Sequence, residues 1–166
     1  MIEVLDDFLS KQQCEFLINQ YLQNEDKLFE VDDETYSFEG INIIKSNIEF
    51  ESVIPKLKSI YYQNRLRIQK VNENTNLNKN YHSHKNDYEA VNNNFVIFLN
   101  DNYNGGELEF SGIESTKINP KTGRIVKFTA EEPHRVLKVL GDRFTLVGFL
   151  DNNITHGDLT IKNHLI

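Results

Sequence analysis

The first stretch of the chain places apolar residues at the spacing of an amphipathic helix. One stripe recurs every three or four positions: Cys14, Leu17, Ile18, Tyr21 and Leu22. Ser10 precedes this stripe and Gln13 follows three residues later, a pairing that caps the N-terminus of a helix from both sides. We therefore predict a helix that begins after Ser10 and packs this stripe into a core.

A second apolar stripe has the same helical spacing. Its members are Phe50, Val53, Ile54, Leu57, Ile60 and Tyr61. Pro55 interrupts it, and proline is tolerated only in the first turn of a helix or at a kink. The pattern predicts a second helix, so the part of the chain up to about residue 65 is expected to be mainly helical.

After residue 65 the pattern changes to short apolar runs of the kind that form strands. Leu66, Ile68 and Val71 alternate, and residues 95–99 form an unbroken apolar run typical of a buried strand. Residues 72–80 are polar and rich in asparagine, which predicts a mobile loop. Further short runs follow, with glycine, proline or aspartate between them: Leu108 to Phe110, Ile118, Ile125 to Phe128, Val136 to Leu140 and Phe144 to Leu150. This series predicts one domain over residues 1–166, an α+β chain whose β-sandwich or barrel core starts near residue 66.

Composition narrows the functional classes. The 166 residues carry a formal net charge of −7, which argues against nucleic acid as the main partner because phosphate binding needs clustered Lys and Arg. The single cysteine, Cys14, excludes an intramolecular disulfide. No apolar run is long enough to span a bilayer, and residues 1–7 lack the basic and apolar regions of a signal peptide. We expect a soluble, cytoplasmic protein.

The candidate chemistry lies in the second half of the chain. The loop at residues 81–87 reads Tyr-His-Ser-His-Lys-Asn-Asp and holds His84 and Asp87, while His134 and Arg143 follow further along the chain. Two histidines and a carboxylate are the ligands of a mononuclear non-haem iron site with open positions. A buried arginine beyond the second histidine can grip a carboxylate in a bidentate manner. The apolar neighbours of Arg143 predict that it is buried and paired with a ligand.

Five segments in order resemble the 2-oxoglutarate and Fe(II)-dependent dioxygenases of the prolyl 4-hydroxylase type. Residues 4–18 resemble the opening strand and helix of that family, and residues 118–128 resemble its strand pair before the second iron histidine. The most specific segment combines residues 98–101, Phe-Leu-Asn-Asp, with residues 105–110, Gly-Gly-Glu-Leu-Glu-Phe. His134-Arg135-Val136 and Gly141-Asp142-Arg143-Phe144 resemble the second histidine and the 2-oxoglutarate arginine. The resemblance covers nearly the whole chain and implies a double-stranded β-helix of the jelly-roll type.

The resemblance also implies a reaction. 2-Oxoglutarate and O2 would occupy the open positions of Fe(II), and oxidative decarboxylation would give succinate, CO2 and an oxidant for a C–H bond, with ascorbate as a further candidate cofactor. Arg143 would bind the far carboxylate of 2-oxoglutarate. Thr145 lies two residues later, so in a strand it shares that face and can add a hydroxyl.

The first ligand pair departs from the His-x-Asp triplet of the family. In the favoured interpretation His84, Asp87 and His134 bind iron through an irregular His-x-x-Asp turn, and only Asp87→Ala among nearby substitutions would abolish iron binding. In the next interpretation His82, His84 and His134 form a three-histidine site in which His84 takes the position of the acid. In the last, Asn86 occupies the carboxylate position as a weaker neutral ligand. Taken alone, His82 is expected to be an exposed loop residue.

A further departure concerns the binding of 2-oxoglutarate. Phe98 stands where many relatives have a tyrosine that donates a hydrogen bond to the cosubstrate, and phenylalanine cannot donate. Tyr81 or Tyr88 is the candidate replacement.

Three functional hypotheses follow. The leading one is a hydroxylase acting on a prolyl residue of a peptide or protein, or on free proline or another amino acid. The second is a non-catalytic relative that binds peptide or 2-oxoglutarate, because the His-x-Asp triplet is not intact. The third, a nucleic-acid demethylase, is disfavoured by the acidic charge. An acidic cluster would face solvent or a basic peptide partner: Glu30, Asp32, Asp33, Glu34 and Glu39.

Overall fold

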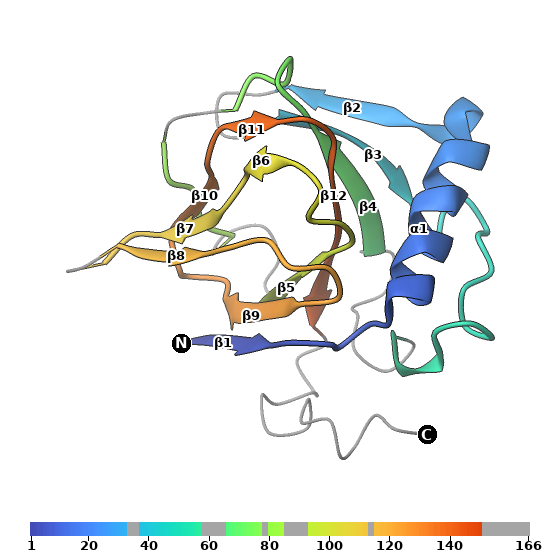
Figure 1. The fold of residues 1–166 in the computed structure, drawn as a ribbon, viewed down its shortest axis with the longest axis horizontal. Coiled ribbons are helices and arrows are strands. Elements are labelled where there is room, and N and C mark those ends of the chain that lie inside the picture. The colour runs from blue at the N-terminus through green and yellow to red at the C-terminus, as the bar shows by residue number, and fades with distance from the viewer. Residues whose placement is uncertain (33–36, 58–65, 78–79, 85–92, 113–114, 151–166) are drawn as a thin grey trace.

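The computed structural model describes residues 1–32, 37–57, 66–77, 80–84, 93–112 and 115–150. Its main feature is an antiparallel sheet of seven strands (Figure 1). In spatial order these are β1 (Ile2–Leu5), β9 (Ile125–Thr129), β5 (Asn93–Phe98), β12 (Arg143–Leu150), β4 (Leu66–Val71), β3 (Ser37–Asn42) and β2 (Phe29–Asp32).

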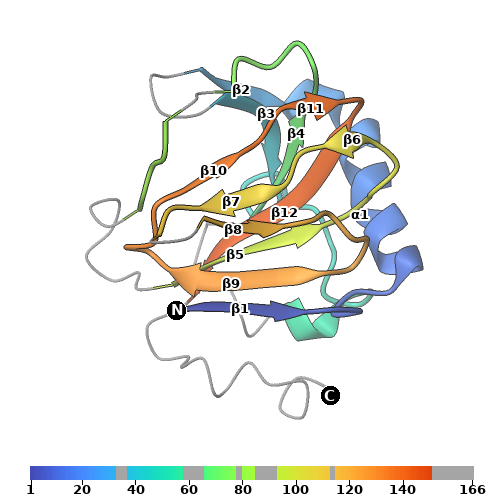
Figure 2. The ribbon, with the colours of Figure 1, turned by 60° about the vertical axis from the view of Figure 1, so that its left-hand side comes forward.

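A smaller layer lies over one face of this sheet (Figure 2). It consists of β10 (His134–Val136), β7 (Leu108–Phe110) and β8 (Thr116–Ile118), and of a separate pair, β11 (Val139–Leu140) with β6 (Asn104–Gly105). Apolar side chains from β5, β9 and β7 fill the space between the layers: Val96, Phe98, Leu108, Phe110, Val126 and Phe128. Two facing antiparallel sheets of this kind form the double-stranded β-helix that the resemblance implied.

The place of β5 in the sheet explains the unbroken apolar run that begins at Phe95. Successive side chains of a strand point to opposite faces. Val96 and Phe98 belong to the core between the two layers, whereas Phe95 and Ile97 belong to the larger core on the other face of the sheet. Both faces of β5 are therefore buried.

The single α-helix of the described residues, α1 (Lys11–Gln23), covers that other face beside β3 and β4 (Figure 1). The predicted cap is confirmed: the Ser10 side chain accepts a hydrogen bond from Gln13 N, and the Gln13 side chain accepts one from Ser10 N. Cys14, Leu17 and Tyr21 of the predicted stripe are buried against the sheet. Leu22 is half exposed, so the buried stripe is narrower than predicted.

The prediction of a second helix is wrong for the part of that segment that the structure describes. Between residues 43 and 57 the chain forms turns and one 3₁₀ turn, Pro55–Leu57. Another 3₁₀ turn of the same length, Glu25–Lys27, follows α1. Pro55 has no N–H to donate and disfavours helical geometry at the residue before it. Phe50, Ile54 and Leu57 are nevertheless buried, so the apolar stripe was a signal of burial rather than of helix.

The N-terminal part is also less helical than expected. It supplies β1, β2 and β3 to the large sheet in addition to α1. β1 pairs with β9 over four residues, and the Asp6 carboxylate that follows it binds Arg124 and Lys121. Within the described residues, no helix has the length and apolar character needed to cross a membrane.

Candidate functional site

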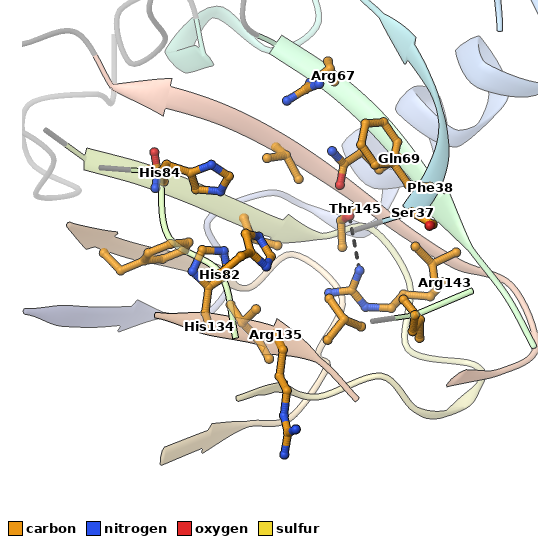
Figure 3. Close-up of a pocket in the computed structure, with 18 of the residues that line it drawn as sticks. Ser37, Phe38, Arg67, Gln69, His82, His84, His134, Arg135, Arg143 and Thr145 are labelled. Carbon is orange, nitrogen blue, oxygen red and sulfur yellow. Dashed lines mark hydrogen bonds between the residues drawn. The ribbon is translucent and has the colours of Figure 1, made fainter. Parts of the chain in front are cut away.

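Three histidine side chains meet on one wall of a cavity between the two layers (Figure 3). His82 and His134 form an antiparallel bridge in which each backbone N–H donates to the carbonyl of the other, at 3.0 and 2.9 Å. Directly paired residues point to the same face, and so does the residue two positions along, His84. The ring centroids are 4.4 Å apart for His82 and His134, and 5.2 Å from His84 to each of the others. One ring nitrogen of each histidine lies within 4.8 Å of the others.

The state of His134 suits a metal ligand. Its ring is 5% exposed, and burial together with the neighbouring His82 lowers its pKa to about 3, so the imidazole is neutral at pH 7. Nδ1 lies 2.9 Å from the carbonyl oxygen of Glu132, which can only accept a hydrogen bond. Nδ1 must therefore carry the proton, and the lone pair of Nε2 is left for a metal ion.

Arg143 lies at the other end of the same cavity (Figure 3). It is 2% exposed, and burial lowers the pKa of its guanidinium, although an arginine stays cationic at neutral pH. Nε donates to the Gly106 carbonyl at 3.1 Å, and Nη1 lies 3.4 Å from the Thr145 hydroxyl. Among the described residues no carboxylate forms an ion pair with it. A buried cation of this kind requires an anionic ligand.

The double-glycine turn positions this arginine. Gly106 has a φ of 72°, and a Cβ added to it would lie 2.8 Å from the Tyr103 ring and 3.0 Å from Arg143 Cδ. Only glycine allows the backbone to approach the arginine so closely and to present its carbonyl to Nε. The Gly-Gly-Glu-Leu segment is thus part of the architecture that holds Arg143.

Two aromatic side chains lie beside Arg143, and only one of them was considered in the sequence analysis. Phe98 packs against Arg143, with its ring centroid 5.2 Å from the guanidinium carbon. Tyr103, which the sequence interpretation did not single out, packs beside Arg143 and Gly106. Burial raises the pKa of Tyr103 to about 12, so its phenol is neutral at pH 7. Tyr103 does not line the cavity and packs beside the guanidinium from outside it.

The cavity between the two ends is lined mainly by apolar side chains: Val96, Leu108, Phe128, Val136, Val147 and Phe149. The guanidinium of Arg143 stands at one end and the cluster of three imidazoles at the other. The arrangement fits a small anion that bridges Arg143 and a metal ion.

A comparison with protein families agrees with this geometry. Residues 69–151, half of the chain, match the model of the 2OG-Fe(II) oxygenase superfamily. The chain belongs to this superfamily. Its enzyme class is therefore that of the 2-oxoglutarate-dependent dioxygenases, as the sequence predicted. No curated protein matches the sequence at a significant level.

Solved structures share the fold. A prolyl-4-hydroxylase from Pseudomonas putida superposes with a TM-score of 0.73 at 16% identity, covering 90% of this chain and 92% of that one. A prolyl hydroxylase from Trichoplax adhaerens, in complex with a hypoxia inducible factor peptide fragment, gives 0.71 at 15% identity, covering 92% and 84%. The viral collagen prolyl hydroxylase from Paramecium Bursaria Chlorella virus-1 gives 0.61 at 19% identity, covering 89% and 94%. At these identities the similarity establishes the double-stranded β-helix fold.

The residues present fit the groups that superfamily membership implies, Fe(II) and 2-oxoglutarate. Imidazole nitrogens are ligands for Fe(II), and the tautomer of His134 is fixed as a ligand requires. The buried guanidinium of Arg143 with the Thr145 hydroxyl beside it fits a carboxylate. Four predicted site residues, His84, His134, Arg143 and Thr145, thus line one cavity.

The other residues considered as iron or cosubstrate ligands are either outside the described residues or differ from the expectation. Asp87, Asn86 and Tyr88 lie outside the described residues, and the role of Asp87 as a ligand stays a prediction. The expectation that His82 is an exposed loop residue is wrong, because its ring is partly buried and packs on His134. The bridge that brings it there is a long-range contact with no local sequence signal.

Tyr81 does not line the cavity, contrary to the predicted contact with the cosubstrate. It precedes His82 and therefore points to the opposite face of the strand. Its hydroxyl donates to a Glu109 carboxylate oxygen at 2.9 Å, and Arg135, the neighbour of His134, donates to the same oxygen from Nε at 2.6 Å. Arg135 also lies 4.5 Å above the Tyr81 ring. Glu109 thus ties together the two segments that carry the histidines.

Replacing Glu109 by glutamine should lower the melting temperature at pH 7. The bonds from Arg135 and Tyr81 hold the pKa of the Glu109 carboxyl below its usual value of 4.5. A carboxyl with a depressed folded-state pKa stabilises the fold above its unfolded pKa, and this contribution is lost as the pH falls. The difference between wild type and Glu109→Gln should therefore narrow below about pH 4. Thermal melts from pH 3 to 7 test this, with the partly exposed Glu107→Gln as the control; a constant difference would contradict it.

Proposed function

We propose that this protein is a 2-oxoglutarate- and Fe(II)-dependent dioxygenase that hydroxylates a C–H bond, with succinate and CO2 as co-products. The main support for the proposal is the shared cavity, with three histidines at one end and, at the other, a buried arginine that no carboxylate of the described residues pairs with. When bound, iron and 2-oxoglutarate supply the oxidising chemistry. The protein binds and orients them and excludes water.

His84 and His134 bind the metal in both leading ligand sets. We propose His82 as the third ligand. This role is supported by the backbone bridge from His82 to His134, and by the candidate ligand nitrogens of the three histidines, which lie within 4.8 Å of one another. Three neutral ligands leave more positive charge on the metal than two histidines and a carboxylate do, and this alters its redox behaviour. Asp87 remains the alternative third ligand.

Arg143 binds the far carboxylate of 2-oxoglutarate, with the Thr145 hydroxyl beside it. This role is supported by burial, by the absence of an internal carboxylate partner among the described residues and by the fixed orientation of the guanidinium. The apolar walls between the two ends keep water from competing for the guanidinium.

The substrate we propose is a prolyl residue in a peptide or protein, or a free amino acid. The prolyl hydroxylases that share the fold support this class, and one of them was solved with a peptide. A depression beside the cavity shares Ser37 and Phe38 with it and is lined by Glu30, Asp32 and Glu39. These carboxylates favour a peptide with basic residues near the target proline.

A turnover assay tests the proposal. The protein, loaded with Fe(II) and supplied with 2-oxoglutarate, is offered proline-containing peptides with lysine or glutamate flanks, and free amino acids. We expect succinate in excess of the uncoupled background, and a peptide mass gain of one oxygen, with the lysine-flanked set. Parallel reactions without ascorbate test whether it is needed. Tight 2-oxoglutarate binding without turnover on any substrate would favour the non-catalytic binding module.

A further inference from the structure

A buried polar side chain, Asn94, lines the cavity and takes no part in the metal and Arg143 sites described above. Asn94 is 2% exposed, and neither its Nδ2 nor its Oδ1 has a hydrogen-bond partner among the described residues. A buried amide without partners is costly, so most such groups in folded proteins are bonded. Because both atoms are unengaged, the amide can turn its NH2 toward a ligand without breaking an existing bond.

Pairing along the large sheet places Asn94 level with the histidines. Its partners on the neighbouring strands are Phe128 and Phe149, which share its face. The Phe128 ring lies 4.6 Å from that of His134, and the Phe149 ring 5.4 Å from that of His84. Asn94 therefore lies on the wall opposite the histidines, between the two rings that contact them.

The same strand shows that Asn94 cannot share a ligand carboxylate with Arg143. Phe98, four residues along β5, is the partner of Thr145. Four residues of a strand span about 13 Å. A ligand held at its far end by Arg143 and Thr145 thus presents only its metal-binding end to Asn94.

We propose that the Asn94 side-chain NH2 donates a hydrogen bond to the C1 carboxylate of 2-oxoglutarate, the end that binds the metal. The inference rests on the proposed function and makes Asn94 a cosubstrate-binding residue. A donor at this position would orient that carboxylate, and the carboxylate would in turn satisfy an amide that has no hydrogen-bond partner among the described residues.

Binding measurements with Mn(II) in place of Fe(II) test this without turnover. Calorimetry would give the Kd for 2-oxoglutarate and for succinate, which lacks the C1 carboxylate but retains the far one. Asn94→Leu removes the donor at similar size and should weaken 2-oxoglutarate binding about tenfold or more, because a hydrogen bond to a charged group is lost. Succinate and Mn(II) affinity should stay as in wild type. Asn94→Thr retains a donor and should recover part of the loss.

Asn93→Ala is the matched control, since Asn93 is adjacent in β5 but points to the other face. The melting temperature of metal-free Asn94→Leu should not fall, because an unsatisfied buried amide is replaced by an apolar side chain. If that variant does not fold, Asn94→Ser, a smaller donor, and Asn94→Ala replace it as the test pair. Unchanged 2-oxoglutarate affinity, or equal weakening of 2-oxoglutarate and succinate, would overturn the inference alone. Absence of 2-oxoglutarate binding to the wild-type protein would overturn the proposed function.

Discussion

His82→Ala should abolish stoichiometric metal binding, whereas Asp87→Ala should retain it. His82 pairs with His134 through two backbone bonds, and the candidate ligand nitrogens of the three imidazoles lie within 4.8 Å of one another. Loss of one ligand leaves two, too few to hold Fe(II) against water. The backbone bonds of the bridge do not involve the side chain, so the fold should survive. Mn(II) binding followed by electron paramagnetic resonance gives the stoichiometry of each variant.

Two further variants serve as the positive and negative controls for metal binding. Ser83→Ala lies between the histidines, is exposed and should bind metal as wild type does. His134→Ala should lose metal in every interpretation. Loss of metal with Asp87→Ala together with retention in His82→Ala would refute the three-histidine centre and establish the two-histidine, one-carboxylate set predicted from the sequence.

Arg143→Met should weaken 2-oxoglutarate binding by about two orders of magnitude, the cost of removing one partner of a buried charge pair. Methionine keeps much of the buried volume, and no internal ion pair is lost among the described residues. Metal affinity should be unchanged, because Arg143 lies at the opposite end of the cavity from the histidines. Calorimetric titration of the Mn(II)-loaded protein with 2-oxoglutarate measures the effect.

Arg124→Met is the matched control for that experiment. Arg124 is paired with Asp6 and does not line the cavity. Its loss should leave 2-oxoglutarate affinity as in wild type. Equal weakening by both substitutions would mean that the effect comes from lost stability rather than from carboxylate recognition.

The parts of the fold that depend on local signals were predictable. The Ser10 cap, the helix after it and the apolar run of β5 each have a physical cause within a few residues. The second helix was predicted wrongly over the described residues 50–57, where the apolar stripe reflects burial and Pro55 disfavours helical geometry.

The same distinction holds for the site. His84, His134, Arg143 and Thr145 were predicted from an ordered set of motifs, and the alternation of a strand placed Arg143 and Thr145 on one face. The position of His82 depends on a bridge to His134, which lies far along the chain. The same bridge turns Tyr81 away from the cavity and toward Glu109. Asn94 directly precedes an apolar run, and nothing in the sequence indicates that its amide has no hydrogen-bond partner among the described residues.

An anaerobic titration of the metal-free protein with Fe(II) and 2-oxoglutarate shows whether the cavity binds both groups together, because chelation of the cosubstrate by Fe(II) gives a visible charge-transfer band. We expect a saturable band at one equivalent of iron, absent in His134→Ala and requiring far more 2-oxoglutarate in Arg143→Met. A folded wild-type protein that gives no band at saturating Fe(II) and 2-oxoglutarate would contradict it.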